Sequence, residues 1–251
     1  LEKCFPDVGM VRFPGYEIRY PENGRMALKI LRSLPYLLER IKKEHHELQE
    51  LNGKYQFNAV ISDNRFGLFH RDIPCIYLTH QVMIKAARGF SLLEPLMHRV
   101  HKNYIMKFNE CWIPDLAGKD NLSGDLGHRF EPGIRTRFIG PLSRFSSKDH
   151  GSEKATNTRL SLLIIISGPE PQRSIFEKII LEQLRRVTFK TVVILGLPGQ
   201  DIHYRLNDNV DVHAHLGTEK MKELISGAEN IVCRPGYTSL MDLYTLNKKA
   251  W

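Results

Sequence analysis

Residues 233–242, CRPGYTSLMD, carry the residue types that bind phosphate at the start of a helix. The apolar stretch AENIVC before them is typical of a buried strand, and TSLMDLYTLN after them has a helical pattern. Gly236 would let a phosphate approach the backbone closely, and Arg234 would supply positive charge. The first helical amides and the nearby hydroxyls would add donors, and they belong to Tyr237, Thr238 and Ser239.

Asp242 stands six residues after Gly236, nearly two turns into the expected helix. Its carboxylate could accept hydrogen bonds from the two neighbouring hydroxyls of a ribose. A structural interpretation stays open: Gly236 forms a turn, Thr238 caps the helix and Asp242 is a surface acid. One short loop does not decide between the two, because short motifs often match by chance.

Two further strand ends in the same half of the chain carry glycine. They are ISGPEPQR at residues 166–173 and LGLPGQ at residues 195–200, and both follow strongly apolar runs. In open α/β sheets, ligands bind beyond the carboxyl ends of the strands. Three polar, glycine-bearing strand ends together favour a phosphate ligand over three unrelated turns.

The first half of the chain offers two groups for proton transfer. Asp63 follows the apolar run FNAVIS, and His80 follows IPCIYLT. If both runs form neighbouring strands, the two side chains lie at the same edge of a sheet. Either could then act as a general base. The alternative interpretation is that Asp63 caps a helix and His80 caps a strand.

The histidines and cysteines do not indicate a metal site. His213 and His215 point to one face of an expected strand without a third ligand in sight, and no Asp-x-Asp motif occurs. The four cysteines show no CxxC spacing, which indicates buried, reduced thiols in a cytosolic protein. They are Cys4, Cys75, Cys111 and Cys233.

Strands and helices alternate along most of the chain, which predicts an α/β fold. Pro35 should kink or split the first helix, and Thr218 is the expected N-cap of a later one. The expected strands cover 57–61, 73–81, 110–115, 137–145, 160–166, 191–195, 209–216 and 230–236. The expected helices lie within 25–53, 83–109, 169–186, 218–228 and 238–247.

The pattern of elements predicts two Rossmann-like domains. Residues 146–158 contain no strongly apolar side chain, so we expect a linker there. Residues 1–145 would form the first domain and residues 159–251 the second. Both ends of the chain stop abruptly for such a fold: KKAW at 248–251 is the expected start of a further strand. We therefore expect a fragment of a longer protein.

The net charge of +8 and the pI of about 9.3 suit a polyanionic partner. Nucleic acid is the weakest option, because the charge is spread out and no aromatic-basic motif occurs. No signal peptide and no apolar run of membrane-spanning length is visible. The basic, apolar helix expected at 97–108 could contact an anionic membrane, although half core and half solvated surface is the commoner arrangement.

GYTSLMD after the strand IVCRPG resembles the nucleotide-sugar site of GT-B glycosyltransferases. It is most similar to the C-terminal domain of glycosyltransferase family 28, the family of the peptidoglycan N-acetylglucosaminyltransferase. The resemblance covers residues 160–251 well. It covers residues 1–145 only loosely, through the strand order and the crossing segment RFIGPLSRF. The whole chain looks like a bacterial relative of that family.

The resemblance implies roles for particular residues. The helix that begins after Gly236 would hold the diphosphate, and Asp242, where the family more often has Glu, would bind the ribose. ISGPEPQR resembles the first phosphate and sugar loop, and LGTEKM resembles the segment that packs on the base. The family's Gly-rich N-terminal loop and its Gln-rich loop after the last strand are absent. The implied contacts from the two matched segments are Ser167, Gly168, Gln172 and Arg173, with Leu216 beside uracil.

The expected protein is thus a GT-B enzyme with two Rossmann-like domains facing a cleft. It would move a sugar from a UDP-sugar to an acceptor that could be lipid-linked, with inversion and without metal or cofactor. It would act in the cytoplasm, with peripheral contact at the inner face of the membrane as an option. Two alternatives stay open: a nucleotide-sugar 2-epimerase or hydrolase on the same fold, and a non-catalytic polyanion-binding protein.

Overall fold

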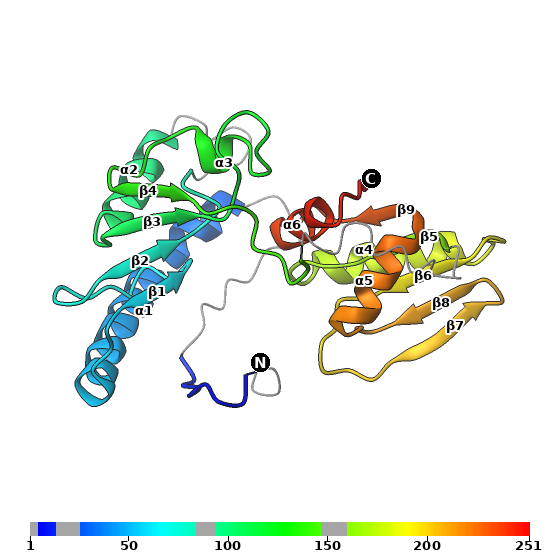
Figure 1. The fold of residues 1–251 in the computed structure, drawn as a ribbon, viewed down its shortest axis with the longest axis horizontal. Coiled ribbons are helices and arrows are strands. Elements are labelled where there is room, and N and C mark those ends of the chain that lie inside the picture. The colour runs from blue at the N-terminus through cyan, green and yellow to red at the C-terminus, as the bar shows by residue number, and fades with distance from the viewer. Residues whose placement is uncertain (1–4, 14–25, 84–93, 147–159) are drawn as a thin grey trace. The chain divides into compact units, whose positions relative to one another are not determined.

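The computed structural model describes residues 5–13, 26–83, 94–146 and 160–251 and has an α/β fold with two sheets (Figure 1). Apart from Ser146, the linker expected at 146–158 lies outside the described residues, and so does Cys4. Contacts divide the chain into two units. The first comprises the described residues up to 112 together with 130–137, and the second comprises 113–129 and the described residues from 138 onward.

The first sheet has four short strands in the order β1-β2-β3-β4. β1 and β2 are parallel, as are β2 and β3. Its core contains the alternate buried residues of β2, Cys75 and Tyr77. The strands are β1 (Val60–Asp63), β2 (Cys75–Leu78), β3 (Glu110–Ile113) and β4 (Arg135–Phe138), and the helices of the first unit are α1 (Met26–Tyr55) and α2 (Glu94–Ile105). The short helix α3 (Asp125–His128) belongs to the second unit.

Helix α1 covers this sheet with one apolar side. Ile41 and Leu48 are buried, and between them the Glu44 carboxylate forms an ion pair with Arg65 of the β1–β2 connection. The helix continues through Pro35, so of the expected kink or split the split is wrong, and a kink stays a prediction. Proline removes a single backbone donor, and the helix of 30 residues extends on both sides of it.

The second sheet has the order β7-β8-β6-β5-β9. Its four central strands are parallel, and the edge strand β7 pairs with β8 in the antiparallel direction. The strands are β5 (Leu160–Ile165), β6 (Thr191–Ile194), β7 (His203–Asn207), β8 (Val210–His213) and β9 (Ala228–Cys233), and the helices are α4 (Gln172–Leu184), α5 (Thr218–Gly227) and α6 (Tyr237–Thr245).

Side chains alternate between the two faces of this sheet. Leu163 packs in a core cluster with Leu224 of α5 and Leu243 of α6. Its neighbour Ile164 points to the other face, into a cluster with Leu184 of α4. Helices on both faces make this half a doubly wound Rossmann-like sheet.

The strand order reverses at β5, which pairs with β6 on one side and with β9 on the other. Beyond β9, the backbone of Trp251 continues the sheet: its amide donates to the Ile231 carbonyl at 2.9 Å, and its carbonyl accepts from Cys233 at 3.2 Å. Residues at the end of KKAW therefore pair as the expected further strand would.

Three smaller expectations also meet the structure. Cys75 and Cys111 are buried free thiols and Cys233 is half-buried and free, as expected, and burial raises the pKa of all three. Thr218 is not the N-cap of α5. Gly217 takes that position and has no side chain to cap with. No helix in the described ranges is long and apolar enough to cross a membrane.

Candidate functional site

The carboxyl ends of β5 and β9 lie side by side, because Ile165 is the register partner of Cys233. The loops that follow them therefore start next to each other at the point where the strand order reverses. Arg234 connects the two loops: its Nη1 donates to the carbonyl oxygen of Ser167 at 3.0 Å. Such a reversal point is where open α/β sheets bind ligands.

Two structural features at position 168 favour glycine over any other residue. Its φ of 108° lies in a region that L side chains rarely adopt. A methyl group on its Cα would also collide with the guanidinium of Arg234. The close packing of Arg234 over the Ser167–Gly168 backbone thus depends on glycine at this position.

Gly236 opens helix α6 beside the same loop. A methyl group built on Gly236 would lie 3.7 Å from Ser167 Oγ and 3.8 Å from Ser239 Oγ, so two hydroxyls flank this position. Gly236 is the N-cap of α6 and has no side chain with which to satisfy the first-turn amides. The amides of Thr238 and Ser239 lie in that turn, where the helix dipole favours an anion.

Asp242 is not a surface acid: it is only 5% exposed. Ser143 Oγ donates to its Oδ1 at 2.6 Å, and Arg144 Nε donates to its Oδ2 at 3.1 Å. Both partners come from the segment after β4 and belong to the same unit as α6. The carboxylate therefore ties this segment to α6, and ribose binding by Asp242 stays a prediction.

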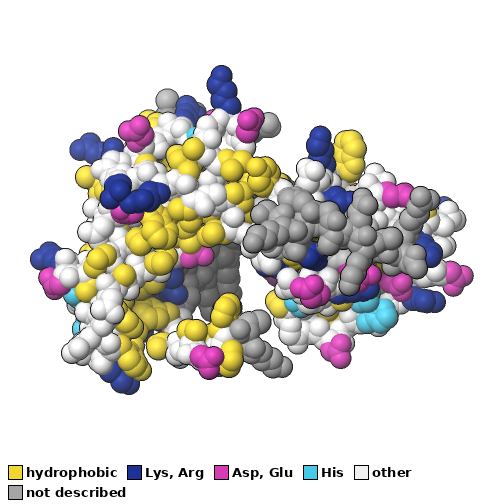
Figure 2. All heavy atoms as spheres, in the orientation of Figure 1, with side chains coloured by type: hydrophobic (Ala, Val, Ile, Leu, Met, Phe, Trp, Pro, Cys, Tyr) yellow, Lys and Arg dark blue, Asp and Glu magenta, His cyan; other side chains and the backbone are white. Residues whose placement is uncertain are grey.

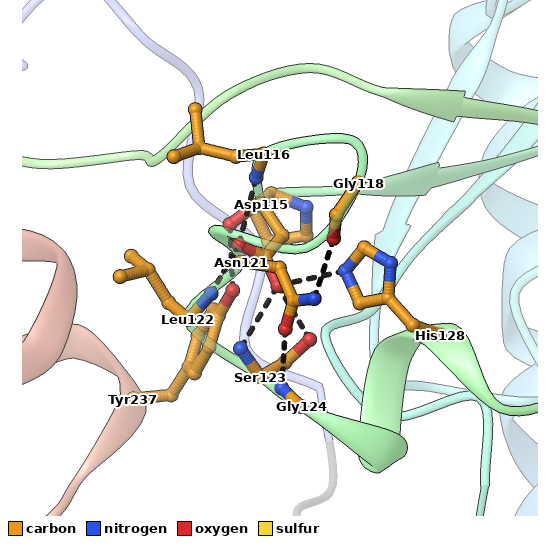
Figure 3. A network of polar contacts seen from close by, with 10 residues as sticks. Asp115, Leu116, Gly118, Asn121, Leu122, Ser123, Gly124, His128 and Tyr237 are labelled. Atoms are coloured by element: carbon orange, nitrogen blue, oxygen red, sulfur yellow. Dashed lines mark hydrogen bonds and ion pairs between the residues drawn. The ribbon is translucent and has the colours of Figure 1, made fainter.

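A second buried carboxylate, Asp115, organises the loop after β3 (Figure 3). Backbone amides of Leu116, Leu122 and Ser123 donate to it at 2.7–2.9 Å, and Ser123 Oγ donates at 2.5 Å. His128 Nε2 lies 3.2 Å from its Oδ2. Burial disfavours the charged form most strongly, but the hydrogen bonds together outweigh it and lower the pKa of Asp115 to about 2.

The first residue of α6 contacts this loop. Tyr237 Oη donates to the carbonyl oxygen of Pro114 at 3.0 Å, and Figure 3 shows its ring pointing toward Asp115. Burial, together with the charge of Asp115, raises the pKa of Tyr237. The Tyr237 side chain therefore anchors the start of α6 and is turned toward the 114–128 loop.

Arg173 and Gln172 begin helix α4 after the first glycine loop. Arg173 is buried and donates to Glu170 and Glu177, both at 2.6 Å, and to the Leu195 carbonyl at 3.2 Å. These contacts hold the loop and α4 together, so a nucleotide contact by Arg173 stays a prediction. Gln172 Oε1 is buried and has no hydrogen-bond partner among the described residues.

Leu216 lies between β8 and α5 and is half-buried against the core cluster that contains Met221. A place beside uracil stays a prediction for this residue. His213 at the end of β8 stacks on His203 of β7, with ring centroids 4.3 Å apart, and burial lowers the pKa of His213. The described residues contain no group of three or more metal-ligating side chains.

Asp63 and His80 lie at the carboxyl ends of neighbouring parallel strands, as expected. Asp63 is the last residue of β1 and pairs in register with Leu78, two residues before His80. Asp63 is exposed and His80 is half-buried. Both belong to the first unit.

Comparison of the chain with known proteins identifies its fold but no family. No family model matches the chain, and no curated protein matches it. Among solved structures, the chain is similar to the glycotransferase of kitacinnamycin, with a TM-score of 0.55 and 13% identity over 88% of this chain and 63% of that one.

Two further similar structures contain a nucleotide. S. aureus MnaA, solved with UDP, has a TM-score of 0.53 and 11% identity over 85% of this chain. Arabidopsis thaliana UGT89C1, complexed with UDP-L-rhamnose, has a TM-score of 0.51 and 12% identity over 96% of this chain. The chain spans 63% of the length of each of these proteins.

The two Rossmann-like sheets and this likeness establish the GT-B fold for the chain. At 11–13% identity the likeness extends to the fold alone.

Proposed function

We propose that this chain transfers a sugar from a UDP-sugar to an acceptor hydroxyl. The observation that carries the proposal is the meeting of the Ser167–Gly168 loop, Arg234 and the N-terminus of α6 at the reversal of strand order. This arrangement offers one guanidinium, two flanking hydroxyls and helical amides to a single anion. A diphosphate fits that set of donors.

The chemistry follows from the charge of the leaving group. The acceptor oxygen attacks the anomeric carbon, the bond from that carbon to the diphosphate oxygen breaks, and its electron pair stays on the diphosphate. Arg234 and the α6 amides stabilise that charge as it develops. In other enzymes a bound metal ion stabilises such a charge. We therefore propose a metal-independent reaction without a cofactor, with inversion from a single displacement.

The proton of the acceptor hydroxyl needs a base. Asp63 and His80 are the candidates in the first unit, because they share the carboxyl edge of neighbouring strands. The acceptor would bind to that unit. The similar structures that contain UDP and UDP-L-rhamnose support uracil as the base of the donor. The family 28 relationship remains part of this proposal.

A lipid-linked acceptor would require contact with a membrane surface. Leu96, Val100 and Met106 at and after α2 are 62%, 48% and 51% exposed, and Arg99 lies on the same stretch. Such an exposed apolar and basic face suits the interface of an anionic bilayer. We propose a cytoplasmic enzyme that contacts the inner face of the membrane in this way.

A protein that binds polyanions without catalysis would need a contiguous basic surface. On the face drawn in Figure 2, Lys and Arg side chains are interspersed with apolar and acidic ones. Affinity for UDP that persists at high salt would support the nucleotide site over a polyanion-binding surface, because nonspecific polyanion binding falls steeply with salt.

The test is calorimetric titration of UDP, UMP and pyrophosphate into the protein, followed by product analysis with UDP-sugars. We expect UDP to bind more tightly than UMP, because the second phosphate meets Arg234 and α6. Sugar transferred to an acceptor would support the proposal. Free sugar or an altered UDP-sugar formed without acceptor would instead indicate a hydrolase or 2-epimerase, and equal affinity for UDP and UMP would contradict the diphosphate site.

A further inference from the structure

The first unit contains a cavity of about 590 Å³ at the sheet edge opposite Asp63 and His80. It lies at the amino ends of β2 and β3, where Asn109 Oδ1 accepts from the Cys75 amide at 2.7 Å. Nothing in the proposed transfer reaction uses this edge. The cavity is lined by His45, Gln49, Phe69, His70, Arg71, Asp72, Lys107 and Asn109.

The lining has an excess of positive charge. Arg71 and Lys107 are exposed, and neither forms an ion pair with any residue that the structure describes. The lining acid is Asp72, whose side chain is 86% exposed and lies 3.9 Å from His70 Nδ1. Asp72 is therefore at the rim in water, where it neutralises little of the charge inside.

Aromatic contacts hold Lys107 in place. The rings of His45 and Phe69 are stacked, with centroids 4.1 Å apart. Lys107 Nζ lies 4.7 Å from the ring centroid of Phe69 and 4.7 Å from that of Tyr104. A lysine ordered over aromatic rings loses less conformational entropy when an anion binds to it.

His45 presents a buried donor without an acceptor. Gln49 Nε2 lies 3.2 Å from His45 Nε2, and donation by the amide places the imidazole proton on Nδ1. That Nδ1 is buried and has no hydrogen-bond partner among the described residues. A buried polar atom without a partner is unfavourable.

We propose that this cavity binds a phosphate oxyanion, either inorganic or carried by a small organic molecule. Arg71 and Lys107 would neutralise its charge, and imidazole and amide N–H groups would donate to its oxygens. The proposal does not depend on the UDP-sugar site, which lies in the other unit.

Two experiments test the proposal: one locates the segments that bind pyrophosphate, and the other measures the affinity. Hydrogen-exchange mass spectrometry of the protein with and without pyrophosphate should show protection at residues 66–74 and 105–110. Protection confined to residues 233–240 would mean that pyrophosphate binds only at the UDP-sugar site, and it would overturn the proposal. UDP would be used in parallel as the ligand of the other site: it should protect 233–240, and any protection that it also gives at 66–74 and 105–110 would mark it as an organic phosphate that the cavity accepts.

Pyrophosphate affinity is measured by calorimetry at low salt for wild type, Arg71→Gln, Lys107→Gln and Lys43→Gln. Lys43 is an exposed α1 residue outside the cavity lining, so its variant controls for net charge. We expect roughly tenfold weaker pyrophosphate binding in each of the first two variants, the size of a lost charged hydrogen bond, and no change in the third. Equal affinity in all four proteins would overturn the proposal.

A comparison of inorganic phosphate with a hexose phosphate distinguishes the two sources. Tighter binding of the hexose phosphate would assign an organic phosphate to the cavity, and equal binding would assign the inorganic ion. Both results support the proposed oxyanion site. Binding of neither, together with no protection by pyrophosphate, would reject it.

Discussion

Arg234 Nη1 donates to the Ser167 carbonyl at 3.0 Å, and its guanidinium packs over Gly168, where an added methyl group would displace it. One guanidinium thus joins the loops after β5 and β9. The Nη1 atom is committed to the carbonyl, and the remaining N–H groups of the fork can donate to a phosphate.

We expect Arg234→Gln to weaken UDP binding by about 1.5–3 kcal/mol, the range for a hydrogen bond to a charged group. Titration calorimetry would measure the loss. Arg185→Gln at the exposed end of α4 is the matched control, because it removes the same charge away from the loops. Equal UDP affinity in both variants would show that Arg234 only connects the two loops.

Gly168→Ala should lower both stability and UDP affinity. A non-glycine residue at φ 108° costs roughly 1–3 kcal/mol, and the added methyl would displace Arg234. Chemical denaturation gives the stability and calorimetry gives the affinity. Gly53→Ala adds a methyl in open space within helix α1 and should be neutral or stabilising. Loss of stability in Gly168→Ala without any loss of UDP affinity would remove this loop from the site.

Asp242→Ala separates a ribose contact from a structural contact. The variant leaves Ser143 and Arg144 without their acceptor, so we expect a loss of roughly 1–3 kcal/mol in the free energy of unfolding. If the carboxylate also binds ribose, UDP affinity falls while pyrophosphate affinity stays unchanged. If both affinities fall together, Asp242 acts only by holding α6 in place.

Most of the second sheet could be predicted from the sequence, because buried parallel strands are continuous apolar runs that polar loops interrupt. The strand β7 was missed. Its residues, HYRLN, are mostly exposed at an edge, so they carry little apolar pattern. The helix cap at Gly217 was also missed, because Thr218 has the better capping side chain and differs by one position.

The site was predictable only where its residues are close in sequence. The loops at 167–168 and 234–239 can be predicted because glycine follows an apolar strand in each. The contacts of Asp242 cannot be predicted in this way, because Ser143 lies 99 residues away along the chain. The role of Asp115 could not be predicted either. The sequence ECWIPD does not distinguish an exposed acid from one that accepts several hydrogen bonds from a folded loop.

Asp115 should make stability depend on acid pH. Its pKa falls from 3.8 to about 2 on folding, so ionised Asp115 stabilises the native state by about 2 kcal/mol above pH 3.8. Because the folded-state pKa is depressed, this contribution is lost as the pH falls from about 4 to 2. Denaturant titrations across that interval should show the decline in wild type and a smaller one in Asp115→Asn. Parallel declines in both proteins would assign the acid sensitivity to other carboxylates.

Under the proposed transfer, His80→Ala and Asp63→Asn test which group accepts the proton of the acceptor. Loss of a general base lowers kcat by roughly 10²–10⁴-fold, whereas UDP affinity should stay at the wild-type value because both residues belong to the other unit. His46→Ala on the exposed side of α1 and Asp208→Asn after β7 are the controls of the same residue types. A loss in one variant alone identifies the base. Wild-type kcat in both variants would mean that neither side chain carries the proton, and the acceptor hydroxyl would then need a base from elsewhere in the protein.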